Sequence, residues 1–217
     1  RGLGDVYKRQ TNTYARERAT EGSCRGLLVL AEQQTAGRGR HGKTWLSPFA
    51  SHLAMSWVWE FERGAQALEG LSLAVGVAVR RALRAQGIAD VELKWPNDIT
   101  SAGKKMAGIL LEMIGDPAGN CCVIIGVGIN YRLCGGNAQS IDQPWTDVAR
   151  QASVCPPRNT LCAALVDHLV SLLDDFAEHG FAPYRQEWQQ ADAFFGQRCT
   201  LSCLLYTSPS PRDPIGS

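Results

Sequence analysis

The sequence contains no long hydrophobic run, no marked excess of charge of either sign and no paired cysteine motif. Without an apolar stretch of membrane-spanning length or a recognisable signal peptide, we expect a cytoplasmic protein with no membrane partner. The 22 Lys and Arg residues balance 21 Asp and Glu residues, so a net charge of +1 provides no overall field to attract nucleic acid. The eight cysteines form no Cys-x-x-Cys pair and the four histidines are scattered, which argues against a zinc site and favours reduced thiols.

What the sequence does have is the composition of one globular domain, placed between two segments that look foreign. With 217 residues, 45% of them hydrophobic, the chain is long enough to bury one sizeable core. Residues 1–10 begin without methionine and residues 206–217 are rich in proline, and both resemble adapter-derived read-through. We therefore expect non-native tails over 1–10 and 206–217, and a folded domain over 11–195.

Hydrophobic periodicity predicts long helices among strands that are joined by short turns. Residues 106–114 and 121–129 are apolar strands separated by a turn rich in Gly and Pro, which predicts a hairpin. Residues 52–59 alternate between apolar and other side chains, which predicts a half-buried strand, and Asn12 is the expected N-cap of the first helix. This pattern favours an α+β fold with a mixed, largely antiparallel sheet and flanking helices. We expect helices over 13–21, 67–86, 159–180 and 184–190, and strands over 26–31, 52–59, 91–95, 106–114, 121–129 and 198–205.

Residues 36–43 read AGRGRHGK, and their glycines reproduce the G-x-G-x-x-G spacing of a Rossmann dinucleotide-binding loop. A Rossmann loop must lead into a helix, but residues 44–49 contain an aromatic residue and a proline and have no helical period. We therefore reject that interpretation. Glycines let a backbone bend around an anion, and arginines pair with carboxylates or phosphates through a planar fork. The segment predicts an anion-binding loop, with a solvated basic turn as the alternative.

Three further polar clusters lie at expected strand ends or in loops, where functional residues gather. Their cations suit the neutralisation of a polyphosphate, and Asp98 suits a magnesium ion that bridges phosphate oxygens. Gly108 and Gly128 interrupt expected strands, which is typical of a ligand that approaches the backbone. The clusters read Lys94-Trp95-Pro96-Asn97-Asp98, Lys104-Lys105-Met106-Ala107-Gly108 and Gly126-Val127-Gly128-Ile129-Asn130.

Together with the glycine–arginine loop, these clusters resemble the motifs of biotin protein ligases. The resemblance covers residues 11 to about 201 and rests on four motifs in series, QTAGRGRHGKTW, KWPND, KMAGIL and GVGIN. It implies a catalytic domain over 11–195 with the fold shared by class II aminoacyl-tRNA synthetases and biotin ligases. It also implies that residues 196–205 begin a C-terminal small barrel that breaks off.

The reaction implied by the resemblance has two steps. Biotin and MgATP first give biotinyl-5′-adenylate and pyrophosphate, and biotin then passes to a lysine of the biotin carboxyl carrier domain of a carboxylase. The implied ligands are therefore biotin, ATP and Mg²⁺, and the implied enzyme is a biotin–[acetyl-CoA-carboxylase] ligase.

The resemblance also assigns roles to individual residues. Lys105 and Arg40 are the implied catalytic residues, and Lys105 would contact the biotin carboxylate and later the acyl phosphate. Asp98 would lie near the triphosphate and its magnesium ion, while residues 132–144, closed by Trp145, match a loop that folds over adenine. The implied biotin-binding residues are Thr11, Asn12, Gln34, Gly37, Arg38, Gly39, Arg40, Lys105 and Gly108. The implied ATP-binding residues are Arg38, Arg40, Lys43, Asp98, Asn130 and Trp145.

Two alternatives remain open at this point. A lipoate–protein ligase or lipoyl transferase resembles this fold and acylates a similar carrier lysine, although the GRGRHG and KWPND motifs favour biotin. The other alternative is a biotin-sensing repressor core that lacks the N-terminal DNA-binding domain of many bacterial relatives. Gln10 stands where the family usually has serine. We expect no nucleic-acid partner for this fragment and allow for a weak homodimer.

Overall fold

The computed structural model describes residues 10–22, 25–62, 64, 68–116, 119–134 and 141–198. Both expected tails lie outside these residues, apart from Gln10. The expected last strand beyond residue 198, and residues 135–140 of the loop expected to fold over adenine, also lie outside them.

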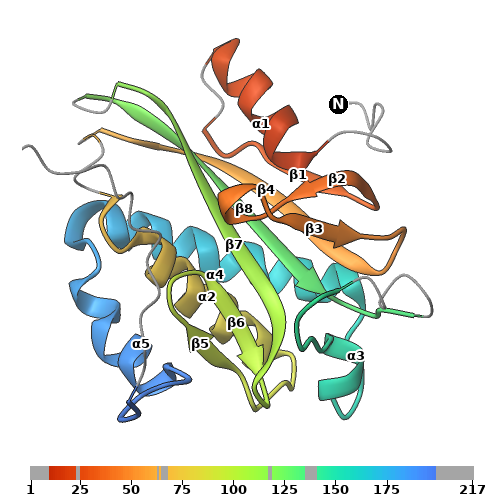
Figure 1. Ribbon diagram of the computed structural model, residues 1–217. Helices are drawn as coiled ribbons and strands as arrows, with labels where there is room; N and C mark the ends of the chain where they lie inside the picture. Colours follow the sequence, from red (N-terminus) through yellow and green to blue (C-terminus); the bar gives the residue numbers. More distant parts are fainter. Residues whose placement is uncertain are drawn as a thin grey trace, which may run out of the picture.

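Six strands form the central sheet, in the spatial order β1-β4-β8-β7-β6-β5 (Figure 1). Every neighbouring pair in this order is antiparallel, and β7 and β8 form the expected hairpin. A separate antiparallel ribbon, β2–β3, is built from the segment that was expected to be a loop. The strands are β1 (Leu28–Ala31), β2 (Gln34–Arg38), β3 (Thr44–Ser47), β4 (His52–Phe61), β5 (Glu92–Lys94), β6 (Asp98–Ser101), β7 (Lys104–Gly115) and β8 (Cys121–Asn130).

Helices lie on both faces of the sheet (Figure 1). α2 (Leu71–Ala85) and α4 (Arg158–His179) pack together on one face, while α1 (Thr11–Thr20) lies on the other, on the same side as the β2–β3 ribbon. The expected α+β class with a largely antiparallel sheet is confirmed. No helix within the described ranges is long and apolar enough to cross a membrane. Shorter elements are η1 (Arg40–Gly42), α3 (Val148–Gln151), η4 (Ala182–Tyr184) and α5 (Arg185–Ala191).

The alternation of side chains along β4 and β8 separates a core face from a site face. Alternate residues of β4 from Leu53 to Phe61 enter the main core with α2 and α4. On the opposite face, Ala15 of α1 packs over Val58 and Ile124. Because both faces are covered, β4 is buried along most of its length rather than half-buried as predicted. Farther along the second face, toward the β2–β3 ribbon, the positions are small or polar: Ala54, Ser56, Gly126 and Gly128.

Two helix starts differ from the prediction for local reasons. α1 begins at Thr11, so Asn12 lies inside the helix instead of capping it, and its side chain makes tertiary hydrogen bonds instead. α2 begins at Leu71, four residues later than predicted. Gly70, at the N-cap, has a φ of 79°, a left-handed conformation that glycine adopts without strain and that separates the helix from the preceding turn.

Candidate functional site

A cavity of about 680 Å³ lies between the β2–β3 ribbon, the start of α1 and the site face of the sheet. A second cavity of about 200 Å³ adjoins it, and both Trp45 and Lys105 line the two cavities. Most residues named from the resemblance come together here. The first cavity is lined by Thr11, Asn12, Gln34, Arg38, Gly39, Arg40, Lys43, Asp98, Lys105 and Gly108. The second is lined by Lys105, Asn130 and Trp145.

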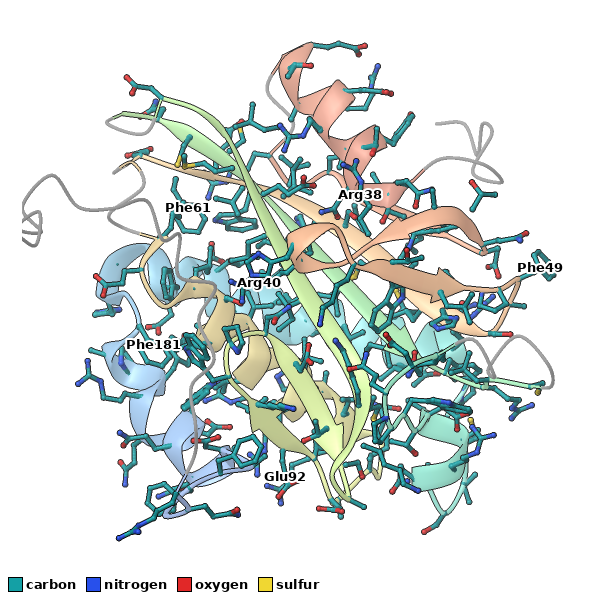
Figure 2. The ribbon with its side chains drawn as sticks, in the orientation of Figure 1. Arg38, Arg40, Phe49, Phe61, Glu92 and Phe181 are labelled. Carbon is teal, nitrogen blue, oxygen red and sulfur yellow. The ribbon has the colours of Figure 1, made fainter. Side chains whose placement is uncertain are left out.

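The β2–β3 ribbon carries the glycine–arginine segment over the sheet. Gly37 lines neither cavity, and a Cβ atom there would collide with the carbonyl oxygen of Trp45 on the neighbouring strand, so glycine permits the close approach of β2 to β3. Figure 2 shows Arg40 beside the closed end of the ribbon and Arg38 next to α1. Arg38 donates from Nη2 to Oγ1 of Thr13 at 2.6 Å, which ties the ribbon to the helix.

The first cavity is cationic although the whole chain is nearly neutral. Five Lys and Arg residues line it, against the single carboxylate of Asp98. Charge of one sign in a cleft with low-dielectric walls attracts ions of the opposite sign, so this cavity suits a polyanion. The five cationic residues are Arg38, Arg40, Lys43, Lys94 and Lys105.

Neutral polar side chains also line the first cavity, at the start of α1 and on β2. Gln34 Oε1 accepts hydrogen bonds from the backbone N–H and the hydroxyl of Thr11, at 3.1 and 3.4 Å. Asn12 accepts from the hydroxyl of Ser56 on β4 and donates to Glu112 Oε2 on β7 at 2.8 Å. Ser56 and Glu112 therefore fix the Asn12 amide. Ser56 and Glu112 were not identified as site residues from the sequence. Each is a polar residue within an otherwise apolar strand, and this pattern could have indicated its role.

Lys105 and Asp98, which the resemblance assigned to different ligands, form an ion pair. Lys105 Nζ lies 2.6 Å from Asp98 Oδ1, and the two side chains are 18% and 20% exposed. Across β6 and β7, Asp98 is in register with Gly108, which leaves space above the strands for the lysine side chain. The carboxylate partly offsets the ammonium charge, so an anion or a metal ion entering the cavity would change this pairing.

The carboxylate of Asp98 suits only a metal ion that brings most of its own ligands. Within the described ranges, no group of three or more His, Cys, Asp or Glu residues is placed to hold a metal ion. Mg²⁺ keeps several water ligands and is usually held by one or two carboxylates together with substrate phosphates. Asp98 therefore fits a Mg²⁺ ion carried by a nucleotide.

Trp45 on β3 lines both cavities, and the sequence alone assigned it no role of its own. A Cβ atom added at Gly128 would lie 2.8 Å from Trp45 Cε2, and one added at Gly108 would lie 3.3 Å from Trp45 Cζ3. These glycines therefore make room for an indole ring, in addition to any ligand. Lys105 Nζ lies 5.5 Å from the centroid of the Trp45 ring, so the cation and the aromatic wall face each other.

The segment from Pro144 to Thr146 runs beside the start of β7 and completes the second cavity. Lys105 donates its N–H to Pro144 and accepts from the N–H of Thr146, both at 2.9 Å. Asn130 is buried and donates from Nδ2 to the carbonyl oxygens of Lys105, at 3.3 Å, and Thr146, at 2.9 Å. These bonds hold the main chain of Trp145 opposite that of Lys105.

The chain is similar in sequence to a known protein family and to several of its members. The model of the biotin/lipoate A/B protein ligase family matches residues 3–130. The bifunctional ligase/repressor BirA of Escherichia coli is 37% identical over 191 residues, which cover 88% of this chain and 59% of that protein. The biotin–[acetyl-CoA-carboxylase] ligase of Paracoccus denitrificans is 33% identical over 175 residues, which cover 78% of this chain and 72% of that protein. The chain thus spans less than two thirds of the E. coli relative.

Similar solved structures include two ligand complexes. Biotin protein ligase from Aquifex aeolicus in complex with biotin and ATP matches with a TM-score of 0.71 at 26% identity, covering 87% of this chain and 76% of that chain. Biotin protein ligase from Leishmania major in complex with biotinyl-5-AMP matches with a TM-score of 0.73 at 25% identity, covering 96% of this chain and 85% of that chain. The resemblance to biotin protein ligases is confirmed, and the chain belongs to the biotin/lipoate A/B protein ligase family.

Proposed function

We propose that this chain activates biotin with MgATP and transfers it to a lysine of a carboxylase carrier domain. In the first step a carboxylate oxygen of biotin bonds to the α-phosphorus of ATP, and pyrophosphate leaves. In the second step the lysine amine bonds to the acyl carbon, AMP leaves and the amine gives up a proton. The observation that carries this proposal is the cationic cavity joined through Trp45 and Lys105 to a second cavity.

The neutral polar side chains at the start of α1 suit the ring system of biotin. The fused rings carry a urea group that both donates and accepts hydrogen bonds, and Thr11, Asn12 and Gln34 offer neutral partners for it. Gly39 and Gly108 line the same cavity. With the rings at the start of α1, the biotin carboxylate is directed toward the cationic part of the cavity.

The nucleotide is assigned to the cationic part and to the second cavity. Arg38, Arg40 and Lys43 are placed to neutralise phosphates, while Asn130 and Trp145 line a space suited to a purine base. The Aquifex relative was solved with biotin and ATP together, which supports two ligands side by side in this fold. A bound Mg²⁺ ion would neutralise phosphate charge.

Lys105 lies where the two substrates meet, because it lines both cavities. Joining a carboxylate to a phosphate brings two anions together, and a preorganised cation stabilises the charge that develops in the transition state. Lys105 is the cation placed to do so, with Asp98 beside it to hold the magnesium ion. Arg40, on the exposed turn of the ribbon, is the second proposed catalytic residue.

The acceptor and the compartment belong to the same proposal. A relative that is named biotin–[acetyl-CoA-carboxylase] ligase supports a carboxylase carrier domain as the acceptor. Among the described residues, Cys121 and Cys134 carry free thiols, which supports the reducing cytoplasm as the compartment. A weak homodimer remains a prediction.

Lipoate is the alternative substrate, because the matching family includes lipoate ligases. Calorimetry with biotin and with lipoate separates the two. We expect biotin to bind with a micromolar or lower Kd, which is about −8 kcal/mol or better, and lipoate to give no saturable signal. Binding of lipoate without binding of biotin would overturn the biotin assignment. Tight biotin binding without any adenylate formation would favour the repressor core.

A further inference from the structure

His52, the first residue of β4, is paired in register with Asn130, the last residue of β8. His52 is 1% exposed, and its Nε2 lies 3.0 Å from Asn130 Oδ1. Asn130 gives its amide hydrogens to the carbonyl oxygens of Lys105 and Thr146. Because both amide hydrogens of Asn130 are donated to these carbonyl groups, its side-chain oxygen faces His52. The His52 ring and the two carbonyl groups together fix the orientation of the Asn130 side chain.

The hydrogen bond to Asn130 also fixes the tautomer of the His52 ring. Because the amide oxygen only accepts, Nε2 must carry the proton and donate it. Burial lowers the pKa of His52 to about 4, with the hydrogen bond to Asn130 opposing this shift, so the ring is neutral at neutral pH. Nδ1 has no hydrogen-bond partner within the described ranges. The ring therefore acts as one donor directed at one acceptor.

Two walls of the second cavity meet at this hydrogen-bonded group. The carbonyl oxygens that accept from the amide belong to Lys105 and to Thr146, the residue after Trp145. Lys105 and Trp145 are themselves bridged through their main chains. His52 lies edge-on to Trp45, with ring centroids 6.0 Å apart, yet it lines neither cavity. His52 therefore influences the cavity only through other residues.

We propose that His52 is a positioning residue for nucleotide binding. By donating to the side-chain oxygen of Asn130, His52 keeps that amide oriented toward the carbonyl oxygens of Lys105 and Thr146, and so keeps the main chain of Trp145 beside that of Lys105. This inference rests on the proposed function, since it takes the second cavity as the place of the adenosine part of ATP. The opposite end of the site is held by a different contact, that between Thr11 and Gln34. Loss of the His52 donor should therefore weaken nucleotide binding much more than biotin binding.

The test compares His52→Leu, which removes the donor, with His52→Gln, whose side-chain amide can donate in its place. His52→Leu leaves Asn130 Oδ1 buried without a donor, and we expect the Kd of MgATP measured by calorimetry to rise about ten-fold. His52→Gln should recover most of this affinity, and the Kd of biotin should stay within about two-fold in both variants. His179→Ala is the matched control, since His179 is exposed on α4.

A second measurement does not depend on the proposed function. Hydrogen exchange at the backbone amides of Lys105 and Thr146 should be faster in His52→Leu than in the parent chain, and close to the parent in His52→Gln. If both amides exchange as in the parent, or if His52→Leu weakens biotin and MgATP equally, His52 is not a positioning residue for the nucleotide. If the parent chain binds no MgATP, the proposed function is wrong, while the exchange rates still decide whether His52 holds the segment.

Discussion

Lys105 takes part both in the packing of the site and in its proposed chemistry. Its ammonium group is paired with Asp98 at 2.6 Å and is mostly shielded from solvent. Lys104, the preceding residue, is exposed at the first position of β7. The two lysines are neighbours in the chain, but of the two only Lys105 lines the cavities. This difference allows a direct comparison of the two.

Replacing Lys105 with alanine should slow adenylate formation by two to three orders of magnitude, about 3–4 kcal/mol, because the developing charge loses its cation. Single-turnover assays with biotin and MgATP measure this rate. The free energy of unfolding should fall by about 1–3 kcal/mol, because the mostly buried carboxylate of Asp98 is left without its partner. Lys104→Ala should keep the parent rate. If both variants react like the parent, Lys105 is not catalytic.

Gly128 should not tolerate a side chain, because the indole of Trp45 lies over it. A Cβ atom there would fall 2.8 Å from the ring, so we expect Gly128→Ala to destabilise the fold by about 1–3 kcal/mol through overpacking. Denaturant unfolding provides the measurement. The control is Gly76→Ala in α2, where the added atom meets Leu93 at an ordinary 3.5 Å and alanine favours the helix. Equal stability of Gly128→Ala and the parent would contradict the placement of the indole.

At the scale of elements, the β2–β3 ribbon is the part of the structure most directly exposed to ligand charge. Its turn places Arg40 and Lys43 in solvent, and His41 within the turn has a left-handed φ of 54°, which is uncommon for a residue with a side chain. Like charges in a short turn repel one another. An anionic ligand in the cavity below should therefore order the turn.

Limited trypsin digestion tests this expectation. Cleavage after Arg40 and Lys43 should slow sharply when biotin and MgATP are both present, because the nucleotide or the adenylate supplies the opposite charge. Cleavage after Arg185, an exposed residue at the start of α5, should change much less. Equal rates at the ribbon with and without ligands would show that the turn does not respond to them.

The sequence predicted elements with clear periodicity and missed elements that depend on distant contacts. The strands β4, β7 and β8 and the helix α4 follow from apolar periodicity. The β2–β3 ribbon does not, because a segment rich in glycine and arginine has the composition of a loop. In the fold, Trp45 of this ribbon packs against Gly108 and Gly128 of the sheet. Asn12 resembles a helix cap in isolation, but Ser56 and Glu112, 44 and 100 residues away, use its amide instead. The order of the motifs in the sequence predicted which residues form the site. The hydrogen bonds between those residues could be identified only from the folded structure.

At the scale of the whole molecule, the distribution of charge matters more than its sum. The chain carries a net charge of +1, yet the first cavity has five cationic residues and one carboxylate. A global field would attract any polyanion, whereas a local one favours an anion that fits the cleft. Solvation also differs between residues of one type, because His52 is buried and His179 is exposed.

The acid stability of the whole protein should depend on His52. Its pKa is about 4 in the folded protein and about 6.5 when unfolded, so below pH 6.5 the unfolded chain binds more protons and the fold loses stability. The loss from this residue is about 1.4 kcal/mol for each pH unit between 6.5 and 4. Unfolding measured at pH 7 and pH 4.5 should therefore show a smaller acid loss, by about 2 kcal/mol, in His52→Gln. An equal loss in variant and parent would contradict this assignment.

If this chain forms biotinyl-adenylate from biotin and MgATP at the junction of the two cavities, it should also exchange labelled pyrophosphate into ATP. Exchange requires reversible formation of the acyl-adenylate, so binding alone gives no signal. We expect exchange that depends on biotin and Mg²⁺, is absent with lipoate, and is lost in Lys105→Ala but kept in Lys104→Ala. Exchange that depends on lipoate and not on biotin, or equal exchange by the two lysine variants, would contradict it.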